Sequence, residues 1–127
     1  MATRSLTRVF PADDTFHKGS LRILSWEGLT KATDDVGETL GTDYASYTER
    51  TVQVIGTFGT GGTCTIQGSI DGTTWATLND PQGNALTVQA AKIETILEAT
   101  PYLRPNITAG DGSTDLDVFI YLRQDRL

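Results

Sequence analysis

One histidine and one cysteine are the side chains of this chain best suited to nucleophilic, acid–base or metal chemistry. His17 has no cysteine or second histidine near it in the sequence, so a zinc or general-base role lacks its partners. Cys64 falls on the apolar side of an alternating run, which favours a small buried hydrophobe over a reactive thiol. Neither residue predicts an active site.

Carboxylates form two further groups. Asp111, Asp115 and Asp117 offer oxygens for calcium, but their spacing is not that of the twelve-residue calcium loop, and a turn followed by a solvated strand face explains them. Glu94 and Glu98 lie one helical turn apart, whereas glycoside cleavage needs two carboxyl groups facing each other across a sugar. We expect a surface pair.

Aromatic side chains are the last candidates. Trp26, Trp75, Tyr102 and Tyr121 could form a platform on which sugars stack, although in a small β-protein such residues are more often core or interface anchors. The chain has no Gly-x-Ser-x-Gly elbow and no phosphate loop. The sequence therefore predicts a protein that is not an enzyme and uses no cofactor or metal.

Length and charge limit the function further. The 127 residues fit one domain, and sixteen acidic against ten basic side chains give a net charge of −6, which argues against a nucleic-acid partner. No apolar run is long enough to cross a bilayer, and the N-terminus does not resemble a secretory signal. We expect synthesis in the cytoplasm without ordinary secretion, and no membrane partner.

The elements that must position these residues are mainly strands. Thr51–Leu78 contains two alternating runs joined by glycines and closed by an Asp-Gly turn, which predicts antiparallel strands with one buried face. Alternation returns at Asp115–Arg123, where Leu116, Val118, Ile120 and Leu122 share one side. The other side carries Phe119 and Tyr121, which we interpret as a partner-binding surface.

Three segments depart from this pattern. Thr30–Asp43 is a long polar loop and a candidate contact loop. Ile93, Ile96 and Leu97 fall at helical spacing, which predicts one or two helical turns within Lys92–Glu98. Pro105 should confine Tyr102–Thr108 to an edge or a bulge. The predicted fold class is all-β: an antiparallel β-sandwich or jelly roll with one short helical turn and an extended N-terminal arm.

The N-terminal arm is predicted over residues 1–20, before a single domain over residues 21–127. The segment Met1–Ser20 has no sustained period, and a frayed terminus is the simplest interpretation. It is also more apolar than a free tail needs, which favours an arm that orders on a partner. The arm residues expected to be buried there are Leu6, Val9, Phe10 and Phe16.

The run Gly68-Ser69-Ile70-Asp71-Gly72-Thr73-Thr74-Trp75 carries a Gly-Ser-x-Asp-Gly-x-x-Trp motif. With the preceding VQVIGTFGTGGTCTIQGS and the later segment Tyr102–Gly112, it resembles small β-rich virion proteins of tailed bacteriophages, including capsid decoration (cement) proteins. The similarity covers roughly Thr51–Arg123. The motif encodes a hairpin and a packed tryptophan and carries no catalytic residues.

This resemblance implies a capsid decoration protein on the exterior of a virion. It would bind the major capsid protein as a homotrimer, reach across neighbouring subunits with its arm, and stabilise the expanded shell. Two alternatives stay open. A head–tail or tail component would assemble into rings, and a carbohydrate-binding or adhesion module would share the Asp-Gly-x-x-Trp hairpin.

Overall fold

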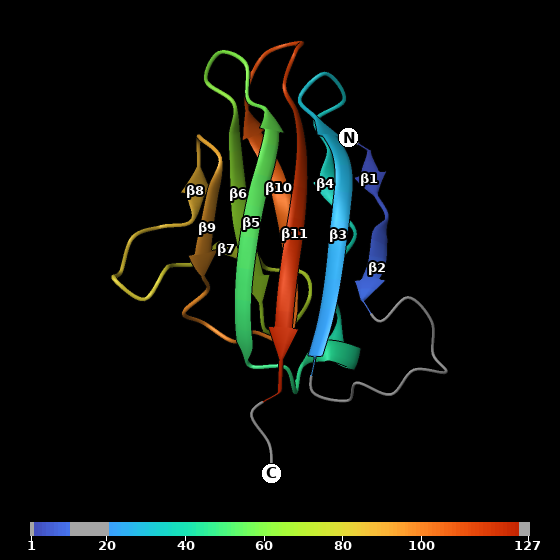
Figure 1. The fold of residues 1–127 in the computed structure, drawn as a ribbon, viewed down its shortest axis with the longest axis vertical. Coiled ribbons are helices and arrows are strands. Elements are labelled where there is room, and N and C mark those ends of the chain that lie inside the picture. The colour runs from blue at the N-terminus through green and yellow to red at the C-terminus, as the bar shows by residue number, and fades with distance from the viewer. Residues whose placement is uncertain (1, 11–20, 125–127) are drawn as a thin grey trace.

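The computed structural model describes residues 2–10 and 21–124, which form two facing β-sheets (Figure 1). Sheet A runs in the order β1 (Thr3–Arg4), β4 (Val36–Gly37), β10 (Tyr102–Ala109), β6 (Thr63–Ser69) and β7 (Ala76–Thr77), with β8 (Thr87–Val88) also paired to β6. Sheet B runs in the order β2 (Leu6–Phe10), β3 (Leu21–Thr30), β11 (Asp115–Arg123), β5 (Glu49–Thr57) and β9 (Lys92–Thr95). All strand pairs are antiparallel except β1–β4. The predicted antiparallel β-sandwich is confirmed.

The core lies between the sheets because each long strand turns alternate side chains inward. On β11 these are Leu116, Val118, Ile120 and Leu122, as the alternation predicted, and all four are fully buried. From sheet A, strands β6 and β10 contribute Cys64, Ile66, Leu103 and Ile107 to the same core. The sheet faces that point away from this core are the surfaces left for function.

Both long sides of the sandwich are closed by a segment that crosses from one sheet to the other. Residues 3–10 run first in sheet A as β1 and then in sheet B as β2. On the opposite side, residues 87–95 run from β8 in sheet A to β9 in sheet B. The outer strands of sheet B are therefore joined to sheet A at both sides.

One end of the sandwich holds the connections β3–β4, β5–β6 and β10–β11 (Figure 1). The Asp111 carboxylate accepts hydrogen bonds from the Thr60 amide (2.8 Å) and from the amide and hydroxyl of Ser113. The Thr114 hydroxyl donates to the Phe58 carbonyl at 2.7 Å. A Cβ on Gly59, whose φ is +67°, would lie 2.3 Å from an Asp111 oxygen, so a glycine is required there. These contacts fix the β5–β6 and β10–β11 loops to each other.

The structure describes residues 2–10 of the N-terminal arm expected over residues 1–20, and these residues do not form a separate arm. Residues 3–4 and 6–10 are strands paired within the chain, so a boundary at residue 20 does not separate an arm from the sheets. Leu6 packs against the core, and Arg4 donates to the buried Asp35 at 2.6 Å. These intrachain partners hold the segment in place. Phe16 lies outside the described residues.

The helical turns predicted within Lys92–Glu98 are wrong. Lys92–Thr95 is β9, paired with β5 from Thr51 to Val54. Of the three apolar residues whose spacing indicated a helix, only Ile96 is buried, whereas Ile93 and Leu97 are exposed on the surface. The apolar spacing was misleading because the three residues do not share one buried face, as they would on an amphipathic helix. Among the described residues, the helical element is instead a 3₁₀ turn, η1 (Thr42–Tyr44).

The expectation that Pro105 lies at an edge or a bulge is also wrong. Strand β10 lies between β4 and β6, and Pro105 pairs with Ile66. The amides of Leu103 and Ile107 donate to Leu40 and Asp35 on the β4 side. The proline ring lies between these bonds and against Gly37, where an added Cβ would meet it at 2.6 Å. The inner strand β10 tolerates a proline here because the neighbouring strand β4 is interrupted, so the missing amide N–H of Pro105 leaves no pairing bond unmade.

The expected contact loop Thr30–Asp43 is partly built into the sandwich. Val36 and Gly37 form β4, and Val36, Gly37 and Leu40 are buried. Asp35 is fully buried and accepts hydrogen bonds from Arg4, Thr33 and both the amide and hydroxyl of Thr30. Burial acts to raise the pKa of Asp35, and these donors outweigh it and hold that pKa below its usual value. The centre of the loop is therefore structural.

Candidate functional site

The outer face of sheet B carries an uncharged surface that the register places together. Odd-numbered residues of β11 and β5 point outward, opposite the outward residues of β3 and β9. Two neighbouring rows of side chains cross all five strands, and we call them the neutral band. One row is Thr7, Ser25, Phe119, Gln53 and Ile93, and the next is Phe10, Ile23, Tyr121, Thr51 and Thr95.

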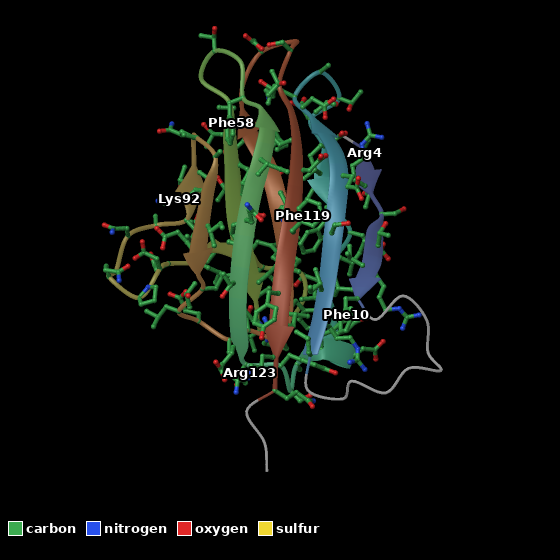
Figure 2. The ribbon with its side chains drawn as sticks, viewed as in Figure 1. Arg4, Phe10, Phe58, Lys92, Phe119 and Arg123 are labelled. Carbon is green, nitrogen blue, oxygen red and sulfur yellow. The ribbon has the colours of Figure 1, made fainter. Side chains whose placement is uncertain are left out.

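None of these ten residues is charged, in a chain with 20% charged residues. Two are apolar and yet exposed: Ile93 is 61% exposed and Tyr121 is 40% exposed. Figure 2 shows Phe119 near the middle of the sheet and Phe10 toward its β2 side. An uncharged surface with exposed apolar side chains is typical of one that contacts another molecule.

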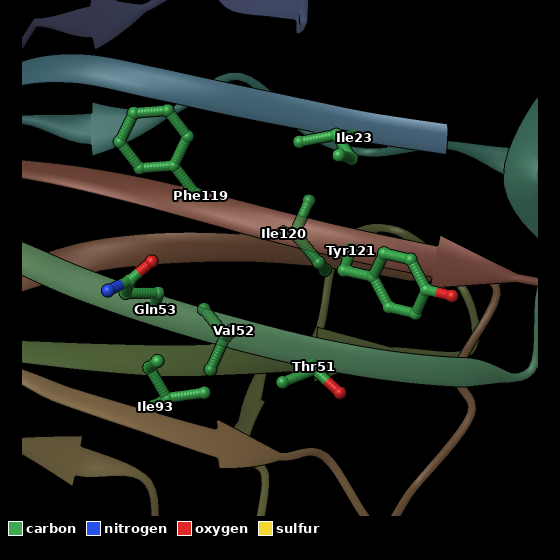
Figure 3. A pocket seen from close by; sticks show the side chains of 8 residues that line it. All are labelled: Ile23, Thr51, Val52, Gln53, Ile93, Phe119, Ile120 and Tyr121. Carbon is green, nitrogen blue, oxygen red and sulfur yellow. The ribbon is translucent and has the colours of Figure 1, made fainter. Parts of the chain in front are cut away.

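The neutral band encloses a hollow of about 260 Å³ (Figure 3). Its lining residues are Ile23, Thr51, Val52, Gln53, Ile93, Phe119, Ile120 and Tyr121. Phe119 and Tyr121 come from β11, and Ile93 reaches in from β9 across Gln53 and Thr51 of β5. The hollow is below the usual range of roughly 300–1,000 Å³ for small-molecule pockets. Its size fits one inserted side chain better than a metabolite.

The two ends of this face differ in charge. Beyond one row of the neutral band lie Glu27, Asp115 and Asp117, which we call the carboxylate end. The Asp117 carboxylate accepts the Gly28 amide at 2.9 Å, and the Ser25 hydroxyl donates to Glu27 at 3.2 Å. Beyond the other row lie Arg123 and Glu49, which pair at 3.5 Å. One end therefore carries three negative charges, and the other is balanced.

The outer face of sheet A is chemically different. Its polar side chains bind one another: Arg104 donates to Gln67 at 2.9 Å, and the hydroxyls of Thr65 and Thr108 lie 2.9 Å apart. The guanidinium of Arg104 also lies 4.2 Å from the centre of the Trp75 ring. These hydrogen-bonding groups are engaged within the chain, and we take the outer face of sheet B as the candidate binding face.

The structure brings together only some of the residues predicted to bind a partner. Phe119 and Tyr121 lie side by side along β11 on the outer face of sheet B. Phe10 pairs with Ile23 and joins the same face at its edge. Val9 is exposed on β2, whereas Leu6 faces the core. The predicted arm and outer-strand surfaces thus meet in part on one face.

Four contributors to the hollow were missed from the sequence: Ile23, Thr51, Gln53 and Ile93. Ile93 was assigned to a helical turn, and Thr51 and Gln53 lie in strands for which only one buried face was predicted. Alternation over residues 93–96 puts one apolar and one polar residue on each face, so the local pattern does not place Ile93 outward. The pairing of β9 with β5 carries no local sequence signal.

The candidate chemical groups do not converge. Cys64 is buried, which raises the pKa of its thiol to about 12. Glu94 lies 3.5 Å from Lys92, while Glu98 accepts hydrogen bonds from the amide and side chain of Asn79. Burial acts to raise the pKa of Glu98, but the Asn79 hydrogen bonds hold it below its usual value. The two glutamates have separate structural partners.

Asp111, Asp115 and Asp117 are also separated in role, since Asp111 holds the loops at the sandwich end and the other two point outward from β11. Among residues 2–10 and 21–124, no three His, Cys, Asp or Glu side chains gather as a metal site. His17 lies outside the described residues.

The four aromatic residues considered as a sugar platform lie on different surfaces. Trp26 is buried in the core and donates its indole N–H to the Glu38 carbonyl at 2.8 Å. Trp75 is covered by Arg104, and the Tyr102 ring lies against the 69–74 turn at Gly72. Tyr121 is on sheet B. They do not form one stacking surface.

Within the described ranges, the structure has no helix of the length and apolarity that crossing a membrane requires. No protein-family model matches this chain, and no curated protein matches it. The inference of function therefore depends on the surfaces of the fold and on the motif resemblance described above.

Proposed function

We propose that this chain is a bacteriophage virion structural protein of the capsid decoration type, without enzymatic activity, that docks through the outer face of sheet B. The observation that carries the proposal is the neutral band with its hollow. An uncharged band that exposes Ile93 and Tyr121 suits contact with a protein surface, because covering it removes water from no charged group. The resemblance at the Gly-Ser-x-Asp-Gly-x-x-Trp motif is the basis for proposing that the protein is part of a virion.

In this proposal the partner is the major capsid protein, and the location is the capsid exterior. Binding that occurs only to the expanded shell stabilises that shell by mass action. The homotrimer implied by the resemblance remains part of the proposal, and static light scattering of the purified chain tests it. The net charge of −6 is consistent with a partner other than nucleic acid.

The test is co-sedimentation of the full chain with expanded and unexpanded shells, assembled from the major capsid protein encoded in the same phage genome. We expect binding to expanded shells and at least tenfold weaker binding by Tyr121→Ser, because the ring lines the hollow and interface aromatics carry much of the binding energy. The matched control is Trp75→Ser, which removes an aromatic ring from the sheet A side. Absence of binding to expanded shells would refute the decoration role.

The second candidate is a head–tail or tail component, which would use the same face between copies of the chain. Rings or tubes formed by the purified chain, with no binding to shells, would support it. The carbohydrate-binding alternative is less consistent with the structure, since Trp75 is covered by Arg104. Glycan binding that Trp75→Ser abolishes and Tyr121→Ser retains would favour it.

A further inference from the structure

The outer face of sheet B is larger than its neutral band, and this determines what a partner must carry. Strands lie about 4.8 Å apart and outward rows about 6.8 Å apart, so the band covers roughly 300 Å². A stable interface buries about 800 Å² on each partner. Any partner that makes a stable complex through this face must therefore extend along the strands onto the charged rows.

Those charged rows are unequal. At the carboxylate end, Glu27 accepts the Ser25 hydroxyl and Asp117 accepts the Gly28 amide. Among residues 2–10 and 21–124, no cation lies within ion-pair distance of Glu27, Asp115 or Asp117. At the other end, Arg123 is already paired with Glu49. A neutral partner that covered the carboxylate end would remove water from three anions without replacing it.

We propose that the outer face of sheet B binds a protein segment that inserts one aromatic or aliphatic side chain into the hollow and sets lysine or arginine residues against Glu27, Asp115 and Asp117. The inserted side chain meets Phe119, Tyr121 and Ile93, and the basic residues lie along the strand direction toward the carboxylate end. This proposal rests on the proposed function only in taking this face as the docking face.

A second copy of the chain fits this face less well. The net charge is −6 for each copy. If two copies stack with their strands aligned in the same direction, their carboxylate ends face each other and repel. If they stack in opposite directions, each carboxylate end faces the balanced pair of Arg123 and Glu49, which supplies no excess positive charge.

The test is NMR titration of the full, isotopically labelled chain with three synthetic peptides. One peptide has a phenylalanine flanked by lysines, the second has glutamates in place of the lysines, and the third has serine in place of the phenylalanine. We expect the lysine–phenylalanine peptide to shift amide signals of the neutral band and carboxylate end, with about tenfold weaker binding for each of the other two peptides. Added salt should reduce this difference between the lysine and glutamate peptides.

The variant that isolates the charges is Glu27→Gln/Asp115→Asn/Asp117→Asn. These substitutions retain the oxygen acceptors for the Ser25 hydroxyl and the Gly28 amide, so the fold should be kept. We expect the variant to bind the lysine and glutamate peptides equally. Glu38→Gln/Asp43→Asn/Glu94→Gln removes as many charges away from this end and should behave as the unmodified chain.

Any of three results would overturn this inference. One is equal binding of the lysine and glutamate peptides by the unmodified chain, and a second is shifts located away from sheet B. Another is a set of amide shifts at the neutral band that depend on protein concentration in the absence of peptide, together with a solution molecular mass that the Tyr121→Ser substitution lowers. That result would assign the face to a second copy. Failure of the proposed function is distinguishable from failure of this inference. If the chain prefers the lysine peptide but does not bind shells, only the proposed function is contradicted.

Discussion

Arg50 is a fully buried cation that has no carboxylate partner among the residues that the structure describes. Its three nitrogens donate to the carbonyls of Tyr47 (2.8 Å), Thr100 (2.7 Å) and Tyr44 (3.2 Å). Burial lowers its pKa, although an arginine remains protonated at neutral pH. The side chain ties the segment before β5 to the segment before β10, so its role is structural.

Replacing Arg50 with methionine should lower the free energy of unfolding by about 3 kcal/mol, because one buried and two partly buried carbonyls lose their donor at about 1 kcal/mol each. Urea denaturation measures this loss. The control is Arg123→Met, which removes a largely exposed pair with Glu49 and should cost less than about 1 kcal/mol. Equal losses in the two variants would contradict the structural role of Arg50.

Asp71 and Asp111 make stability depend on pH. Hydrogen bonds from the Thr74 and Thr73 amides hold the pKa of Asp71 far below its ordinary 3.8, and Ser113 and Thr60 do the same for Asp111. A carboxyl group with a lowered pKa stabilises the fold above its unfolded pKa, and this contribution decreases as the pH falls toward its folded pKa.

We therefore expect the urea midpoint to decrease as the pH is lowered from 5 through about 3.8 and below. Asp71→Asn/Asp111→Asn should have a smaller slope over this interval, because its side chains no longer titrate. An unchanged slope in this variant would assign the acid sensitivity to other carboxylates, such as Asp80.

At the scale of the elements, β2 closes one side of the sandwich. Leu6 faces inward against the core, while its neighbour Thr7 points outward and is exposed. We expect Leu6→Ala to lower the free energy of unfolding by about 2 kcal/mol, the lower range for truncating a buried leucine, because Leu6 is only partly buried. Thr7→Ala should change it by less than about 0.5 kcal/mol.

Chemical denaturation of these two variants tests whether residues 2–10 belong to the folded domain. If the segment were an arm that orders only on a partner, Leu6→Ala would be as stable as Thr7→Ala. Truncation of the whole segment is a less specific test, since it removes the backbone pairing with β3 and the Arg4–Asp35 contact as well.

Much of this element structure could be predicted from the sequence, because local alternation determines which side of a strand is buried. The inward residues of β11 and the turn at Asp71–Gly72 are where the pattern placed them. β9 could not be predicted in this way, since its position depends on pairing with β5, thirty or more residues away. Pro105 was misplaced because the gap in β4 is a property of the partner strand.

The candidate site was predictable to a similar extent. Phe119 and Tyr121 were identified because two aromatic residues on an outward strand face are unusual. The neutral band was not identified, because it combines single outward residues from five strands whose order is set by tertiary structure. Arg50 and Asp35 were missed since buried charges interrupt rather than extend a hydrophobic pattern.

At the scale of the whole molecule, the two outer faces suit different environments. The hydrogen-bonded polar face of sheet A is suited to solvent, and the neutral band of sheet B is suited to a protein surface. A docked chain would therefore turn sheet B toward its partner. The loops at both ends of the sandwich would then lie along the partner's surface.

A charge introduced into the band should separate docking from folding. Thr51 points outward and lines the hollow, so Thr51→Glu should keep the fold and lower affinity for expanded shells by about a hundredfold, because the carboxylate would be buried without a partner. Thr77→Glu places the same charge at the exposed edge of sheet A. Its affinity should be unchanged in the same co-sedimentation assay, and an equal loss in both variants would contradict the assignment of the docking face.

The most direct test of the proposed decoration role is electron cryomicroscopy of virions produced with this chain. We expect many copies on the outer shell, each with Phe119, Tyr121 and Ile93 of sheet B against the major capsid protein and with sheet A exposed to solvent. Copies found at a single vertex or on the tail, or shell-bound copies with sheet A against the capsid, would contradict the account.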